Sequence, residues 1–82
     1  MENHIPYILY VRTGCPFCAK VLAVFKELGI MFEERNISDI AISEELVARG
    51  GKRVVPYLVD TVTKEEMYES DAIIAHVRAK HA

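Results

Sequence analysis

The chain has 82 residues, 51% of them hydrophobic, a length that suits one small domain built around a single core. Ten basic and twelve acidic residues leave a net charge of −2 without a long basic run, which argues against nucleic acid as a partner. The longest strongly apolar stretch, residues 21–25, is far shorter than the roughly 20 residues of a membrane helix, so we expect no membrane segment. We expect a single domain over residues 1–82 and, because residues 1–4 do not begin a secretory signal, a cytoplasmic location.

Periodicity and turn residues predict a strand followed by a helix in the first third of the chain. Residues 5–11 form an apolar run rich in β-branched and aromatic side chains, which predicts a buried strand. Pro16 suits the first position of a helix, and Gly29 suits its end. The apolar residues that recur at helical spacing between them are Val21, Leu22, Phe25 and Leu28.

The middle of the chain predicts a second strand and a second helix. Residues 30–37 alternate loosely between apolar and polar side chains, as a strand does. We expect either Ser38 or Ser43 to cap the helix that follows, and the glycine pair at 50–51 to end it. The short apolar stripe of this helix consists of Leu46 and Val47.

The last third predicts a hairpin and a final helix. Residues 57–59 form an apolar run, residues 60–61 turn it, and a second short strand ends near Tyr68. Ser70 is expected to cap the final helix, with Asp71 in its first turn, where the helix dipole favours an anion. The inward-facing residues of this helix are Ile73, Ile74 and Val77.

The predicted order of elements is strand, helix, strand, then helix, strand, strand, helix. A strand-helix-strand unit of this length implies two parallel strands with a right-handed crossover, and the trailing hairpin extends the same sheet. The order is similar to that of thioredoxin-like domains. We therefore predict an α/β fold, thioredoxin-like βαβαββα, with a mixed four-stranded sheet flanked by three helices.

The stretch TGCPFCAK, residues 13–20, places two cysteines where the first strand meets the first helix. If Cys15 is the N-cap and Pro16 the first helical residue, the Cys15 sulfur faces unpaired backbone N–H groups, which stabilise a thiolate. Cys18 lies one turn further, within reach of a disulfide, and we expect it to be more buried and less ionised. Arg12 either adds a positive charge beside Cys15 or points into solvent. The positions predict an attacking thiol and a resolving thiol.

Two other uses of the cysteines are open: buried structural side chains, or ligands of a structural zinc ion. Structural zinc needs four ligands, and beyond the two cysteines the chain offers only three histidines, without finger-like spacing. We therefore expect no metal site. We expect the two histidines of the final helix, His76 and His81, to be solvated.

Residues 10–18, YVRTGCPFC, resemble the active-site signature of glutaredoxins, in which a basic residue precedes a Cys-Pro-aromatic-Cys sequence. Residues 51–56, GKRVVP, resemble the second signature of that family, which ends in a valine and a cis-proline. Ser70 and Asp71 lie where glutaredoxins carry the pair that holds the γ-glutamyl end of glutathione. The resemblance covers the chain from Ile5 to about Val77.

This resemblance implies a glutathione-dependent thiol-disulfide oxidoreductase acting on protein disulfides and on glutathione mixed disulfides. Cys15 is then the nucleophile and Cys18 the resolving thiol. Glutathione is the expected co-substrate, disulfide-containing or glutathionylated proteins are the expected partners, and we expect a monomer with no other cofactor. The residues expected to bind glutathione are Arg12, Phe17, Arg53, Val55, Pro56, Ser70 and Asp71, with Lys52 as an alternative to Arg53 for the glycyl carboxylate.

The sequence departs from the glutaredoxin pattern at Tyr68 and Glu69, where that family usually has a Gly-Gly pair. Residues 55–73 instead resemble the N-terminal domain of glutathione transferases, whose Glu-Ser-X-Ala-Ile segment holds the same γ-glutamyl carboxylate. Such a transferase needs a further helical domain, so we do not expect conjugating activity. Two rival functions are an iron–sulfur cluster carrier that uses Cys15 and bound glutathione, and a thioredoxin-like reductant served by a flavin reductase.

Overall fold

The computed structural model describes residues 5–81, in which helices and strands follow the predicted order. Residues 1–4, on which the expected absence of a signal segment depends, lie outside the described part, as does residue 82. None of the helices in the described part is both long and apolar enough to cross a membrane. The elements are β1 (Tyr7–Val11), α1 (Pro16–Leu28), β2 (Glu33–Asn36), α2 (Ile40–Gly50), β3 (Tyr57–Asp60), β4 (Glu66–Tyr68) and α3 (Ser70–Lys80).

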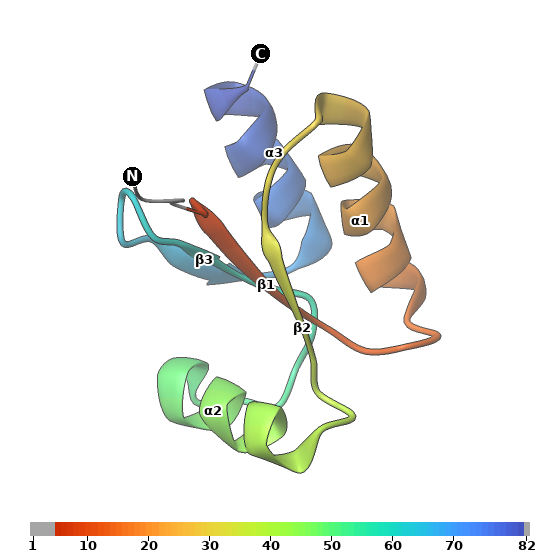
Figure 1. The fold of residues 1–82 in the computed structure, drawn as a ribbon, viewed down its shortest axis with the longest axis vertical. Coiled ribbons are helices and arrows are strands. Elements are labelled where there is room, and N and C mark those ends of the chain that lie inside the picture. The colour runs from red at the N-terminus through yellow and green to blue at the C-terminus, as the bar shows by residue number, and fades with distance from the viewer. Residues whose placement is uncertain (1–4, 82) are drawn as a thin grey trace.

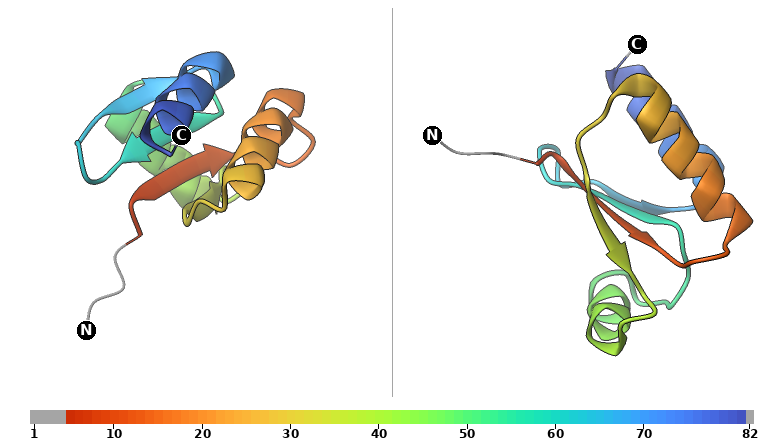
Figure 2. Two further views of the ribbon diagram at one scale, coloured as in Figure 1. Left: turned by 90° about the horizontal axis from the view of Figure 1, so that it is seen from above. Right: turned by 45° about the vertical axis from the view of Figure 1, so that its right-hand side comes forward.

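The strands form one mixed sheet in the order β2-β1-β3-β4. β1 pairs parallel with β2 and antiparallel with β3, and β3 pairs antiparallel with β4. Helices α1 and α3 lie side by side on one face of the sheet, and α2 covers the other face (Figures 1 and 2). The predicted thioredoxin-like βαβαββα fold is therefore confirmed.

The core is divided between the two faces because successive side chains of a strand point to opposite sides. Leu9 of β1 packs with Phe25 of α1 and Ile73 of α3. Its neighbour Tyr10 packs on the other side with Leu46 of α2. Alternation along one central strand thus anchors all three helices.

Helix α1 begins and ends where the sequence predicts. Cys15 is the N-cap in an extended conformation, and Pro16 is the first helical residue. Gly29 ends the helix with a φ of 66°, a left-handed conformation that favours glycine. Because β1 runs directly into this turn, Cys15 lies at the carboxyl end of the central strand pair.

The predicted start of α2 is wrong. Asp39 is the N-cap, and its carboxylate accepts the backbone N–H two residues further on. Ser38 precedes this cap, whereas Ser43 lies a full turn inside the helix and is buried. The predicted apolar stripe is half right: Leu46 is fully buried, but Val47 is 43% exposed because consecutive helical residues are about 100° apart.

The predicted cap of α3 is also wrong. Glu69 is the N-cap and makes no side-chain capping bond, while Ser70 is already the first helical residue. Glu69 has a φ of 76°, a conformation in which glycine is favoured. A glycine, which the glutaredoxin pattern leads us to expect near this position, adopts this conformation without strain. The pattern Glu69-Ser70 therefore keeps the turn without a glycine.

Candidate dithiol active site

The Cys15 sulfur lies against the first turn of α1, as the sequence predicts. It accepts the backbone N–H of Cys18 at 3.3 Å. Both cysteines are free thiols; the Cys15 side chain is 7% exposed, and Cys18 is 1% exposed. The predicted difference in burial is confirmed.

The surroundings of the two sulfurs separate their acidities. Burial opposes ionisation of Cys15, but hydrogen bonds from the Cys18 thiol and from the backbone N–H groups of Cys18 and Phe17, together with the Arg12 charge, hold the pKa of Cys15 below its usual value. Burial and the hydrogen bond to Cys15 raise the pKa of Cys18 to about 11. At neutral pH, Cys15 is therefore the better nucleophile of the two.

A groove of about 340 Å³ opens beside the Cys15 sulfur. Its apolar rim includes Phe17, which is 61% exposed, and the half-exposed Val54. Among the residues predicted to bind glutathione, four line this groove together with Cys15: Arg12, Phe17, Arg53 and Val55.

The groove is electropositive because its two arginines have no carboxylate partner. The chain has five arginines. Among the residues that the structure describes, Arg35, Arg49 and Arg78 form ion pairs, whereas Arg12 and Arg53 form none. A pair of unneutralised guanidinium groups beside one groove favours an anionic ligand.

The segment before β3 offers the groove an unpaired stretch of backbone. The peptide bond between Val55 and Pro56 is cis, which confirms that prediction. The pairing of β3 with β1 begins only at Tyr57. Within residues 5–81 the backbone N–H and C=O of Val55 therefore have no partner, and a peptide-like ligand can bond to them.

Ser70 and Asp71 lie at the start of α3 and do not line the groove. Asp71 forms an exposed ion pair with Lys20 of α1, whose Nζ lies 2.9 Å from its Oδ1. Such pairs contribute little stability, so Asp71 can exchange Lys20 for another cation at small cost. Ser70 is buried, and its backbone N–H belongs to the first turn, where helices leave amides unpaired.

The structure distinguishes between the two cations considered for the glycyl carboxylate. The Lys52 ammonium lies 5.8 Å from the centroid of the Tyr68 ring, and Lys52 does not line the groove, whereas Arg53 does. The Tyr68 hydroxyl accepts the Lys52 N–H at 3.1 Å and donates to its carbonyl at 3.0 Å. A Cβ on Gly50 would lie 2.3 Å from that hydroxyl, so Tyr68 requires a glycine there.

A second, smaller groove of about 130 Å³ reaches both cysteines from the side of β2. Its polar residues include Thr13 and Asn36, whose Nδ2 donates to the Thr13 hydroxyl at 2.9 Å. The sequence analysis did not identify these residues. Their position follows from the parallel pairing of β1 with β2, because parallel strands bring their carboxyl ends to the same edge.

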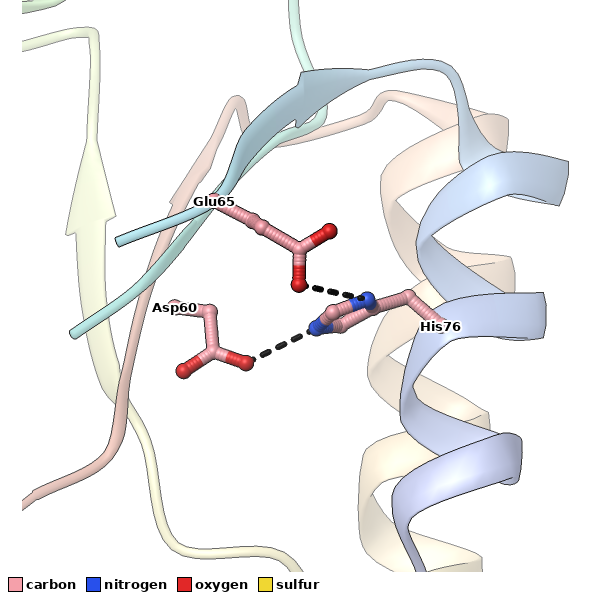
Figure 3. A group of neighbouring side chains, drawn as sticks. All are labelled: Asp60, Glu65 and His76. Atoms are coloured by element: carbon pink, nitrogen blue, oxygen red, sulfur yellow. Dashed lines mark hydrogen bonds and ion pairs between the residues drawn. The ribbon is translucent and has the colours of Figure 1, made fainter. Parts of the chain in front are cut away.

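The expectation that both histidines are solvated holds for His81, which is exposed, but is wrong for His76, whose side chain is 13% exposed. His76 Nε2 lies 2.8 Å from Asp60 Oδ2, and its Nδ1 lies 3.9 Å from Glu65 Oε1, so the ring sits between two carboxylates (Figure 3). His81 Nε2 lies 2.9 Å from the hydroxyl of Tyr7. Both histidines connect α3 or its end to the strands.

The cluster of Asp60, Glu65 and His76 has ligand-type atoms within 4.8 Å of one another. The Asp60 carboxylate, however, is already satisfied by two backbone N–H groups of its own turn, by His76 and by the Lys80 ammonium at 3.5 Å. A metal ion would have to displace that ammonium. We therefore assign the cluster to joining the β3–β4 turn to α3.

Asp60→Asn is expected to lower the free energy of unfolding at pH 7 by about 1–3 kcal/mol, because it weakens a buried hydrogen-bonded carboxylate. Burial opposes ionisation, but the bonds to His76 and the turn amides, with Lys80, lower the pKa of Asp60 from 3.8 to about 2. A depressed pKa contributes stability above the unfolded value, and that contribution is lost as pH falls through about 2. Urea unfolding should show that the variant is less stable than wild type at pH 7, and that the difference in the free energy of unfolding is smaller near pH 2. Glu44→Gln, at an exposed carboxylate outside the cluster, is the control. An Asp60→Asn protein as stable as wild type contradicts the assignment.

Fold and site together define a class of protein: a thioredoxin-like domain with a Cys-X-X-Cys pair at the start of its first helix. The family model described as the N-terminal domain of glutathione S-transferases matches residues 9–82. The chain belongs to that family.

Relatives of both predicted kinds are found. Glutaredoxin 1 of Rickettsia felis is 32% identical over 54 residues, which cover 62% of this chain and 53% of the relative, so the chain spans about half of that protein. The structure of Ure2p in complex with glutathione matches 98% of this chain and 38% of its own, with a TM-score of 0.77 and 28% identity. A wheat glutaredoxin matches 89% of this chain and 71% of its own, with a TM-score of 0.70 and 25% identity. The resemblance to both families is confirmed.

Proposed function

We propose that this domain binds glutathione in the groove beside Cys15 and catalyses thiol-disulfide exchange with protein disulfides and glutathione mixed disulfides. The observation that carries the proposal is one juxtaposition. The Cys15 sulfur, with its lowered pKa, opens onto a groove lined by the two unpaired arginines. Family membership and the similarity to a glutathione-bound structure support the same ligand.

The groove suits a peptide with a carboxylate at each end. Arg53 is the candidate partner of the glycyl carboxylate, since Lys52 is held against Tyr68. The free backbone groups of Val55 suit the peptide bond on either side of the ligand's cysteine. This arrangement would place the ligand sulfur next to Cys15.

The γ-glutamyl end is assigned to the first turn of α3. Backbone N–H groups at a helix N-terminus bind carboxylates, and Ser70 is the first residue of this helix. Asp71, released from Lys20, would pair with the ligand's ammonium group. These two assignments depend on the resemblance and on the position of the helix.

Exchange begins when the Cys15 thiolate attacks the glutathione sulfur of a mixed disulfide. A Cys15–glutathione disulfide forms, the bond to the protein breaks, and the protein leaves as a thiolate that takes a proton from water. The thiolate of a second glutathione then attacks the bound glutathione sulfur. This step releases oxidised glutathione and restores the Cys15 thiolate.

Protein disulfides require Cys18. Cys15 attacks one protein sulfur, and the thiolate of Cys18 then attacks Cys15, which frees the protein and leaves a Cys15–Cys18 disulfide for reduction by two glutathione molecules. The hydrogen bond and the charge of the Cys15 thiolate both raise the pKa of Cys18 in the resting protein. Both contributions disappear once Cys15 is in a disulfide, so capture of the substrate favours ionisation of the resolving thiol.

The test is reduction of a mixed disulfide between glutathione and a small thiol, coupled to glutathione reductase. We expect turnover that requires glutathione and saturates with the mixed disulfide. A parallel assay replaces glutathione and its reductase with a flavin-dependent thioredoxin reductase. Turnover in that second assay alone would support the thioredoxin-like function and contradict the proposal.

The family match favours a second candidate function, transfer of glutathione to an electrophile. The position of Cys15 argues for exchange instead, because its thiolate attacks the ligand sulfur when that sulfur belongs to a disulfide, a step that conjugation of reduced glutathione does not use. Conjugation of a chloronitrobenzene by wild type and by Cys15→Ser compares the two. We expect neither protein to accelerate it.

We further propose a cytoplasmic monomer that uses no metal and no cofactor besides glutathione. Anaerobic purification with glutathione should yield a colourless protein. Visible absorbance that Cys15→Ser abolishes would support the iron–sulfur carrier instead.

A further inference from the structure

We propose that Ser43 is a positioning residue that orients the Arg53 guanidinium for an anionic ligand in the groove. Ser43 lies on α2 and is 8% exposed. Its hydroxyl oxygen accepts the Nε–H of Arg53 at 2.6 Å. The inference rests on the proposed function, which itself assigns Ser43 no role.

Arg53 needs such a support because little else holds its side chain. It lies in the connection between α2 and β3, and none of the described residues supplies it with a carboxylate. The bond from Nε to Ser43 fixes one edge of the planar guanidinium. The two terminal nitrogens stay available for a ligand carboxylate, and a guanidinium oriented beforehand loses less freedom on binding.

Ser43 is itself held on a rigid base. Its backbone N–H donates to the Asp39 carbonyl at 2.9 Å in the first turn of α2. Two residues after Ser43, the Glu45 carboxylate accepts the hydroxyl of the buried Tyr10 at 2.6 Å and also binds Arg35. These contacts tie α2 to β1 and β2, so the Ser43 hydroxyl has a defined place relative to the sheet.

The backbone beside Arg53 is fixed independently. The Tyr68 hydroxyl bonds to both the N–H and the C=O of Lys52. Tyr68 therefore sets the path of the loop, while Ser43 sets the direction of one side chain on it. Removing the Ser43 hydroxyl should release the guanidinium without changing that path.

A purely structural bond between Ser43 and Arg53 makes a different prediction, and a double-mutant cycle separates the two. The measurement is the dissociation constant of reduced glutathione by isothermal titration calorimetry. We expect Ser43→Ala to weaken binding about fivefold, the equivalent of one hydrogen bond, and Arg53→Ala about tenfold or more. In the Arg53→Ala background, Ser43→Ala should change the affinity by less than about twofold, since the two residues act as one unit.

Three further variants sharpen the test. Ser43→Thr keeps the hydroxyl and should restore most of the affinity. Arg53→Lys keeps the charge but lacks the Nε donor, so it should lose about as much affinity as Ser43→Ala, and this exposed change does not threaten folding. Ser38→Ala, at an exposed serine just before α2, should bind as wild type does.

The kinetic signature is a raised KM for the glutathione mixed disulfide with an unchanged kcat, because Ser43 touches no reacting atom. If Ser43→Ala lowered the affinity for glutathione equally in the wild-type and Arg53→Ala backgrounds, the inference would be overturned and the proposed function would stand. Wild-type affinity of Arg53→Lys would have the same consequence. Failure of the wild-type protein to bind glutathione would overturn both.

Discussion

Cys15→Ser should reduce turnover of a glutathione mixed disulfide to the uncatalysed rate, whereas Cys18→Ser should keep most of it. A serine hydroxyl at the N-cap receives the same amide but does not ionise at neutral pH, so no nucleophile is left. The mixed disulfide pathway never uses Cys18, since a second glutathione removes the first. Steady-state rates with a small glutathione mixed disulfide measure both effects.

Toward a protein disulfide, both variants should lose turnover, but only one of them should trap the substrate. Cys18→Ser captures the protein on Cys15 but cannot resolve it, so a covalent complex accumulates and becomes visible by mass spectrometry under non-reducing conditions. Cys15→Ser should form no such complex. Equal loss of mixed disulfide turnover in both variants would show that the two thiols do not have the separate roles assigned to them.

The second large effect concerns the pH dependence of alkylation at Cys15. The midpoint of the rate should lie below that of free cysteine, about 8.5, because hydrogen bonds and the Arg12 charge outweigh burial in lowering the pKa of Cys15. The thiolate is the reactive form, so the rate should stay high as pH falls and decline only below that pKa. While Cys15 is unmodified, Cys18 should react only in strongly alkaline solution, since burial and the Cys15 sulfur raise its pKa to about 11.

Variants at Cys18 separate the causes of the low midpoint. Cys18→Ala removes the thiol that donates to the Cys15 sulfur and should raise the midpoint, whereas Cys18→Ser keeps a donor and should raise it less. Arg12→Ala should raise the alkylation midpoint slightly. Added salt should abolish this difference from wild type, because Arg12 is exposed and its charge is screened. A wild-type midpoint equal to that of free cysteine would leave the exchange mechanism without its activated nucleophile.

The strands and α1 were predictable because each depends on residues close together in the chain. An apolar run predicted β1. Pro16 and Gly29 predicted the two ends of α1 because each has a backbone preference that suits its position. Cys15 and Cys18 could be placed for the same reason, because their relation is set by a single turn of helix. The cis peptide before Pro56 came from the family resemblance, not from local preference.

The N-caps of α2 and α3 were predicted wrongly because several polar residues near the start of each helix can act as an N-cap. Asp39, rather than either serine, is the N-cap of α2, and the helix begins at the next residue. At α3 the chain turns through a positive φ at Glu69, which leaves Ser70 inside the helix. Competing local choices of similar energy are resolved by how the helix packs.

The sequence by itself determined the order of elements and the dithiol at the start of α1, because short-range backbone rules and a local motif suffice for these. Only the tertiary structure decided which side chains meet. Arg53 faces the groove while Lys52 lies on Tyr68, His76 binds Asp60, and Ser43 holds Arg53. These contacts join residues from separate elements. Because a long side chain can reach several possible partners, the packing of α2 and α3 against the sheet decides which contact forms.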